Sequence, residues 1–212
     1  MKNSSKLSAL YGLFDNLSIL KGITSPPLTS APVTSVNGLT GAVTLAAGVS
    51  SVNGASGAVV LSGTPVQVVE TDLTASATCA VVIPQDDTIP QITEGTEIMT
   101  ATITPKSASS ILYIDVTVHG TTNTAGSSFV AALFRDSGAN AIGASYVQTT
   151  NASFASLVTF RVKVAAGSTA ATTFRVRVGP GTAVTAVYNG NSGVRQLGGA
   201  CVSSIRIIEV LA

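Results

Sequence analysis

Charged residues are scarce in this sequence. They make up 10% of the 212 positions, and the formal net charge is +1, against a usual charged share of about 25%. A chain so close to neutral has no general attraction for nucleic acid or for an anionic membrane. The sequence also lacks any apolar run of about 18 residues, so it predicts no helix that inserts into a membrane.

Aromatic and sulfur-containing residues are few as well. Tryptophan is absent, aromatic residues make up 5% of the chain, and there are two cysteines. The core must therefore be built mainly from Val, Ile, Leu and Ala, and the abundance of Val and Thr favours pleated sheets. Cys79 and Cys201 lie far apart in apolar surroundings, without a metal-binding spacing. We expect free, buried thiols rather than a disulfide.

What the sequence does contain is a short stretch that occurs twice. Residues 35–45 read SVNGLTGAVTL and residues 51–61 read SVNGASGAVVL, with eight of the eleven positions identical. The Asn-Gly pair in each copy suits a two-residue hairpin turn, and the Ala-Val-x-Leu that follows reads as a short strand. Two such units bury too little to fold alone. We predict that three chains in register form a narrow shaft over residues 35–64; the alternative is an ordinary pair of hairpins beside a domain.

The N-terminal part differs from the rest of the chain. Within residues 1–22, four apolar residues recur at the spacing of one helix face. They are Leu7, Leu10, Phe14 and Leu17. A signal peptide is the competing interpretation, but polar residues interrupt the apolar stretch and no small-residue cleavage site follows. We predict a helix that docks on another protein or bundles with its own copies, or else folds back on the domain. Three prolines then make residues 23–34 a semi-rigid linker.

From residue 65 to the end, the sequence predicts many short strands. Several segments alternate apolar with polar side chains, as in 160–164 and 174–178, and Gly, Asn, Pro and Asp stand between the segments. The expected strands are 66–70, 77–83, 97–103, 111–118, 128–134, 141–147, 154–164, 172–178, 183–188 and 200–210. We predict an all-β fold with a jelly-roll-like β-sandwich over residues 65–212.

Together these features resemble the fibre proteins of bacteriophage tails and related virion fibres. The tandem SVNGxxGAVxL is similar to the shaft repeats of that family, and five later stretches are similar to its terminal knob. These are PKSASSILYIDVTVHG, ALFRDSGANAIG, TFRVRVGP, VYNGNSG and SSIRIIEV. The resemblance implies a homotrimer with a short shaft, a β-sandwich knob and a location in the virion. It implies a structural tail fibre that binds the host cell surface.

Other roles remain open within this resemblance. A head fibre or decoration protein on the capsid fits the same architecture, and a glycan-depolymerising tailspike is a less favoured alternative. In a fibre, the N-terminal helix attaches the chain to a tail adaptor or capsid protein through Leu7, Leu10, Phe14 and Leu17. The knob then faces a glycan or protein of the host, and three identical sites on one trimer raise avidity.

No catalytic or metal-binding constellation can be assembled from the sequence. The single histidine, His119, ends a predicted strand, and Asp86-Asp87 lies in a proline-flanked turn where carboxylates are more often solvated than bound to a cation. Arginines at alternate positions favour an exposed strand face with ion pairs between subunits, to Asp115, Asp136 and Glu209, over a basic patch for an anionic glycan, because the net charge is near zero. We therefore predict no enzyme, no cofactor and no metal.

Host binding is expected on loops of the β domain, since loops on a rigid scaffold carry many binding residues. The longest polar loops are 120–127, 135–140 and 189–193. Asn, Thr and Ser can hydrogen-bond sugars there, and Tyr188 could stack on a sugar ring. The candidate receptor-binding residues are Asn123, Asn140, Tyr188, Asn189 and Asn191. The opposing interpretation is that they are turn formers only, because turns favour the same residue types.

Overall fold

The computed structural model describes residues 51–52, 55–56 and 63–212. The chain divides into two compact units, residues 1–60 and 61–212, and each is described by itself. In the first unit, β1 (Ser51–Val52) and β2 (Ala55–Ser56) pair antiparallel. Their register leaves only Asn53 and Gly54 between them, which is the spacing the sequence predicts for a two-residue hairpin. The expected helix, the linker and most of the shaft repeat lie outside the described residues.

The second unit consists of two antiparallel sheets and a small hairpin. Its strands are β3 (Pro65–Leu73), β4 (Ala77–Cys79), β5 (Thr96–Ile103), β6 (Ile111–Thr122), β7 (Ser128–Arg135), β8 (Gly143–Gln148), β9 (Ser156–Ala165), β10 (Thr172–Pro180), β11 (Ala186–Tyr188), β12 (Gly190–Asn191), β13 (Val194–Arg195) and β14 (Ser203–Val210). One short 3-10 turn, Leu197–Gly199, precedes β14. No helix among these residues is long and apolar enough to cross a membrane.

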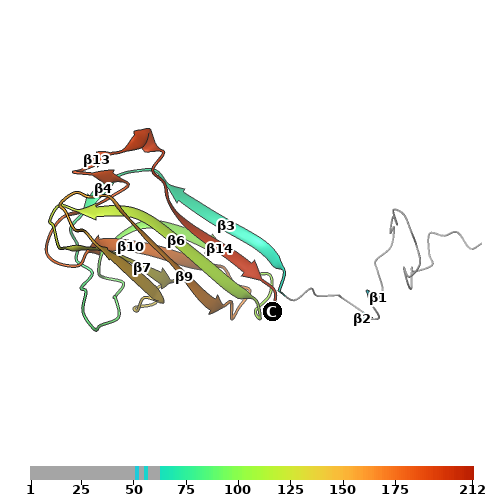
Figure 1. The fold of residues 1–212 in the computed structure, drawn as a ribbon. Coiled ribbons are helices and arrows are strands. Elements are labelled where there is room, and N and C mark those ends of the chain that lie inside the picture. Colours follow the sequence, from blue (N-terminus) through green and yellow to red (C-terminus); the bar gives the residue numbers. More distant parts are fainter. Residues whose placement is uncertain (1–50, 53–54, 57–62) are drawn as a thin grey trace, which may run out of the picture. The chain divides into compact units, whose positions relative to one another are not determined.

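The larger sheet has the order β3-β14-β6-β11-β4, and β9 also pairs with β6. β6 is long enough to hold both partners, because β9 pairs along residues 111–120 and β11 along residues 120–122. The smaller sheet has the order β5-β10-β7-β8. In Figure 1 the long strands β3, β14, β6 and β9 run side by side over β10 and β7. The prediction of an all-β fold is confirmed, and both sheets are antiparallel.

The main core lies between the two sheets. Alternation places one face of each long strand inward, as in β6, where Leu112, Ile114, Val116 and Val118 are all fully buried. They pack in one cluster with side chains of the smaller sheet such as Phe174. Gly120 is required at the end of this strand, because an added Cβ would lie 2.2 Å from the ring of Phe129.

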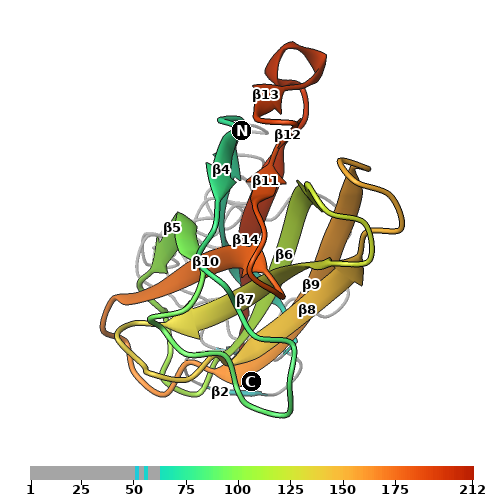
Figure 2. The ribbon, with the colours of Figure 1, turned by 90° about the vertical axis from the view of Figure 1, so that its left-hand side faces the viewer.

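A second, smaller core lies on the other side of the smaller sheet. Residues 80–95, which we call the covering segment, leave β4 and run across that face before entering β5 (Figure 2). Ile83 and Ile92 of this segment pack against Val130, Ala132 and Phe134. β7 is therefore buried on both faces. This explains why the strand expected over residues 77–83 ends at Cys79, since residues 80–83 leave the larger sheet and pass over the smaller one.

The covering segment is held close to the sheet by backbone contacts. Ile83 donates its N–H to the carbonyl of Pro180 over 3.0 Å, and Ala141 donates to the carbonyl of Pro90 over 2.9 Å. Gly179 permits the close approach, because an added Cβ would lie 2.2 Å from the carbonyl oxygen of Val81. The segment is thus a fixed layer of the fold.

Candidate functional site

The larger sheet has one face on the core and one face that no described segment covers. On this second face, cross-strand register brings side chains of β3, β14, β6 and β9 into rows. We call this surface the outer sheet face. Its larger apolar members are Val66, Val68, Ile111, Tyr113, Ile208, Val210 and, at the far end of β9, Leu157.

Six of these apolar members, all except Leu157, gather at the end of the sheet near the chain's C-terminus. Val68 lies opposite Ile208, which lies opposite Tyr113, which lies opposite Lys163. Val66 and Val68 expose 39% and 49% of their surface, and the other four are half-buried. The Lys163 ammonium stands 5.9 Å from the centroid of the Tyr113 ring. A contiguous, partly exposed apolar patch rimmed by polar groups is consistent with a protein-binding surface.

Next to the apolar rows lies a row of alternating charge. Glu70, Arg206, Asp115 and Arg161 stand opposite one another across four strands. Arg161 donates two hydrogen bonds to Asp115, the second over 2.8 Å, and this carboxylate raises the pKa of the guanidinium. Among the described residues, no carboxylate lies within 4.0 Å of the guanidinium of Arg206. The face therefore carries both signs, with one arginine left without an ion pair.

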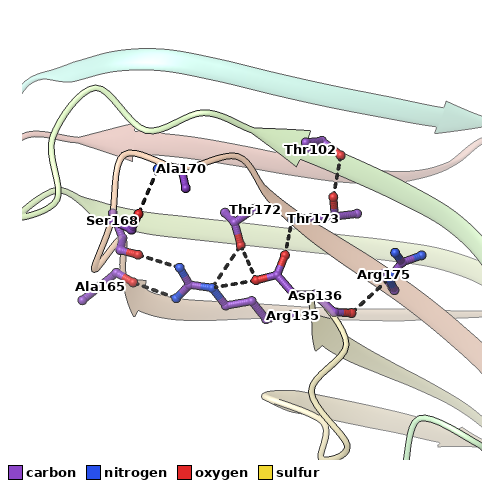
Figure 3. Close-up of polar contacts among 10 residues, drawn as sticks. Thr102, Arg135, Asp136, Ala165, Ser168, Ala170, Thr172, Thr173 and Arg175 are labelled. Carbon is purple, nitrogen blue, oxygen red and sulfur yellow. Dashed lines mark hydrogen bonds and ion pairs between the residues drawn. The ribbon is translucent and has the colours of Figure 1, made fainter.

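Other arginines serve the fold. Arg135 donates to Thr172 over 3.1 Å and to the carbonyls of Ala165 and Ala166, so it ties the end of β7 to the β9–β10 loop (Figure 3). Asp136 accepts hydrogen bonds from the hydroxyl of Thr172 and the N–H of Thr173, each over 2.8 Å. This network closes one end of the two sheets. The expected ion pairs between subunits stay a prediction. In this chain Asp115 pairs with Arg161 and Asp136 with Arg135, and the third expected partner, Glu209, is fully buried.

The five candidate receptor-binding residues are not brought together. The 120–127 and 189–193 loops lie at the same end of the sheet, because β11 pairs with the last residues of β6. The 135–140 loop, with the exposed Asn140, lies at the other end of β7. Asn123 is exposed and accepts the N–H of Thr185 over 3.1 Å. The three loops therefore form no single surface.

Three of these candidates lie around β11 and β12. Tyr188 and Asn191 are half-buried, and burial raises the pKa of Tyr188. Asn189 is fully buried at φ +50°. Its side-chain amide donates to the carbonyls of Leu73 and Ala75 over 2.6 and 3.1 Å, and its carbonyl accepts from Ser203 over 2.6 Å. The contacts of Asn189 are those of a structural turn residue and give no support to a receptor contact.

The remaining chemically active side chains form no centre. Half-buried His119 lies on the outer sheet face opposite Leu157. Both cysteines are free; Cys201 is half-buried, whereas Cys79 is buried and its pKa is raised to about 12 by burial. In the part of the chain that the structure describes, no group of three His, Cys, Asp or Glu could hold a metal ion.

Sequence reasoning missed the outer sheet face. The signal was present in β6, where Ile111 and Tyr113 stand at alternate positions that elsewhere hold polar residues. It was present again in β14, where Ile208 and Val210 follow Arg206 on the same side. The charges of Asp115, Arg161 and Arg206 drew attention to a solvated face and away from these apolar neighbours.

Comparison with protein families gives one clear match. The sequence profile described as the Pgp3 C-terminal domain matches residues 68–212, which is more than half of the chain. No curated protein matches the chain.

The search of solved structures finds distant similarities. Eiger TNF from S. frugiperda has a TM-score of 0.39 at 10% identity, over 70% of this chain and 94% of that one. The VP2 subviral particle of infectious bursal disease virus has a TM-score of 0.36 at 13% identity, over 71% of this chain and 42% of that one. The Gt strain of the same virus has a TM-score of 0.35 at 14% identity, over 86% and 47%. These likenesses are too weak to assign a function.

The family match overturns the resemblance to phage fibres. The repeat that suggested a fibre lies within residues 35–61, outside the matched region, and alternating strands with Gly-Asn turns are common to many β-sandwiches. The predicted roles as tail fibre, head fibre or tailspike are wrong, and so is the predicted location in a virion, because the matched family is that of the Pgp3 C-terminal domain and not a family of phage fibres. The attachment residues Leu7, Leu10, Phe14 and Leu17 lie outside the described residues, so their role stays a prediction. By its match over residues 68–212, the chain belongs to the Pgp3 C-terminal domain family.

Proposed function

We propose that this chain is a non-catalytic, secreted binding protein whose jelly-roll-like domain assembles into a homotrimer through the outer sheet face. The observation that carries the proposal is the uncovered apolar surface of Val66, Val68, Tyr113 and Ile208 on a well-packed sheet. Pgp3, whose C-terminal domain defines the family, is a secreted chlamydial virulence protein, and the family domain is not known as enzymatic.

The charges of the face favour a second copy of the same chain as its partner. A face that selects a charged partner carries charges of one sign, opposite to those of the partner. This face instead carries charges of alternating sign, in the row Glu70, Arg206, Asp115 and Arg161. Such a row can meet its own copy with opposite charges in register. Arg206 has no ion pair among the described residues and can meet a carboxylate such as Glu70 of a neighbouring copy.

The number three is supported by the sequence. The tandem repeat over residues 35–61 needs apolar surface from outside the chain, and three chains in register supply it most simply. A chain with a net charge of +1 and 10% charged residues also has weak electrostatic repulsion between copies. The repeat therefore favours the same number of copies that we propose for association through the outer sheet face.

The test uses two valines with the same exposure. Val68 on the outer sheet face and Val81 on the covering segment each expose 49% of their surface. Light scattering at micromolar concentration should give the native chain three times its mass of 21.2 kDa. Val68→Glu should lower the mass to that of one chain, because a carboxylate in each copy would be desolvated in the contact. Val81→Glu should leave the trimer intact.

Two results would contradict this proposal. One is a native chain that runs as a monomer across the micromolar range. The other is an equal loss of mass in Val68→Glu and Val81→Glu, which would show that the outer sheet face has no special part in assembly. Circular dichroism of both variants checks that the fold is retained.

A further inference from the structure

A second surface, on the opposite side of the domain, has a hollow of about 180 Å³. It lies between the covering segment and β8, on the outer face of the smaller sheet. Its lining includes Pro84, Gln85, Asp86, Pro90, Val130 and Tyr146. Sites for drug-sized ligands measure about 300–1,000 Å³, so this hollow matches a single small ring.

One side of the hollow offers an aromatic ring. Tyr146 on the edge strand β8 stands opposite Val130 of β7 and exposes 55% of its surface. An exposed aromatic ring at the rim of a hollow gives a flat apolar surface whose negative face attracts polarised C–H groups. Val130 and the two prolines provide the apolar floor and walls.

The other side offers one hydrogen-bond acceptor and one donor. Oδ1 of Asp86 accepts the N–H of Thr88 over 2.9 Å and also its hydroxyl, which lowers the pKa of Asp86 and keeps it ionised. Among the described residues, Oδ2 of this carboxylate has no partner. The Gln85 carbonyl accepts a hydrogen bond from Ser128, and its amide NH₂ has no partner within the same part of the chain. Adjacent donor and acceptor groups suit two neighbouring hydroxyls.

We propose that this hollow is a saccharide-binding site, in which the ring of Tyr146 stacks on the C–H face of one pyranose while Asp86 and Gln85 hydrogen-bond neighbouring hydroxyls. A pyranose has an apolar C–H face and a rim of hydroxyls, which matches a ring on one side and polar groups on the other. Anions are disfavoured by the Asp86 carboxylate. A metal ion is disfavoured because no group of three possible ligands exists among the described residues.

The site is independent of the proposed assembly. It lies on the smaller sheet, whereas the outer sheet face lies on the larger sheet, and the core separates them. In a trimer, three such sites would remain open and would raise the avidity for a surface with many saccharides. The proposal therefore goes beyond self-association and names a class of ligand.

The test is saturation-transfer NMR on the full chain with three methyl glycosides, those of mannose, galactose and N-acetylglucosamine, and with lysine methyl ester as a cationic probe. We expect transfer to at least one glycoside, strongest on the ring protons of one face. Tyr146→Ala should weaken binding about tenfold or more, the loss typical of removing a stacking ring. Tyr146→Phe should keep binding, and Asp86→Asn should weaken it less than Tyr146→Ala does.

Phe154→Ala is the matched control, because Phe154 is an aromatic residue exposed by 59% that does not line the hollow. The control should bind as the native chain does. The proposal is overturned if no glycoside receives saturation, if transfer persists unchanged in Tyr146→Ala, or if only lysine methyl ester binds. Light scattering on the same samples separates the two proposals: a monomer that binds a glycoside overturns the assembly alone, and a trimer that binds none overturns this site alone.

Discussion

The covering segment packs on the outer face of the smaller sheet at β7, whereas none of the described residues covers the outer face of the larger sheet. β7 of the smaller sheet is buried at every position from Ser128 to Phe134, because the covering segment packs on its second face. β6 of the larger sheet alternates between buried and half-buried residues. The two strands show that continuous apolar sequence marks cover on both faces, while apolar residues on an open face mark a place for another molecule.

The contrast between the two sheet faces predicts its largest effect for the removal of a side chain under the covering segment. Phe134 is fully buried there, so Phe134→Ala should lower the free energy of unfolding by about 3–5 kcal/mol. The matched change on the outer sheet face, Tyr113→Ala, should cost less, about 1–2 kcal/mol in dilute protein, because Tyr113 is only partly buried by its own chain. Urea denaturation measures both. If both variants lost the same free energy of unfolding, packing under the covering segment would contribute no more to stability than packing on the outer sheet face.

Removal of a buried carboxylate on the inner face of β14 should lower the free energy of unfolding by a smaller amount. Glu209 is fully buried, and its carboxylate accepts the N–H groups of Lys106 and Ser107 over 2.7 and 3.2 Å. Glu209→Ala leaves both donors without this acceptor, so stability should fall by about 2–4 kcal/mol. Glu209→Gln keeps one acceptor oxygen and should cost less. If both variants unfold at the same urea concentration as the native chain, the Glu209 carboxylate does not stabilise the turn at residues 106–107.

The two cysteines allow buried and partly exposed positions to be compared by the reactivity of their thiols, which is the smallest of the expected effects. Cys79 is buried, and burial raises its pKa from 9.0 to about 12, whereas Cys201 is only half-buried. At neutral pH, iodoacetamide should therefore label one thiol per native chain, at Cys201. Mass spectrometry of the digested protein identifies the labelled residue. Rapid labelling of Cys79 in the folded protein would contradict its burial.

The raised pKa of Cys79 also predicts how the stability of the protein depends on pH. The thiol of Cys79 ionises near 9 in the unfolded chain and near 12 in the folded chain, so the unfolded chain holds fewer protons between these values. Stability should be unaffected by this group below about pH 9 and should fall as the pH rises from there toward 12. Cys79→Ala should remove this part of the alkaline loss, which thermal melts across that range would show.

The sequence predicted the strands well, because alternation is a local property. Each of the ten expected strands overlaps an observed one, and β5, β6 and β7 begin within one residue of the expected positions. Residues whose roles depend on distant partners could not be predicted. Glu209 looked like a surface charge, yet it turns inward to the backbone of residues 106–107, more than a hundred positions earlier. Asn189 looked like an exposed loop residue, yet it bonds Leu73, Ala75 and Ser203.

The candidate surfaces were harder to predict for the same reason. Val68, Tyr113 and Ile208 come from three separate strands, and only the cross-strand register places them in one row. Tyr146 and Asp86 are likewise separated by 60 positions in the sequence and lie at one hollow because the covering segment crosses the sheet. The turn signals that pointed to the 120–127, 135–140 and 189–193 loops identified turns correctly but not a shared surface.

The most direct test of the central claim is the mass of residues 63–212 alone, measured by sedimentation equilibrium at micromolar concentration. This segment contains both cores and the whole outer sheet face, and it lacks the repeat. If the outer sheet face joins the copies, the segment should self-associate to three copies, and Val68→Glu should return it to one. A native segment that stays at the mass of a single copy over the full concentration range would contradict the account, and would leave residues 1–62 as the source of any assembly.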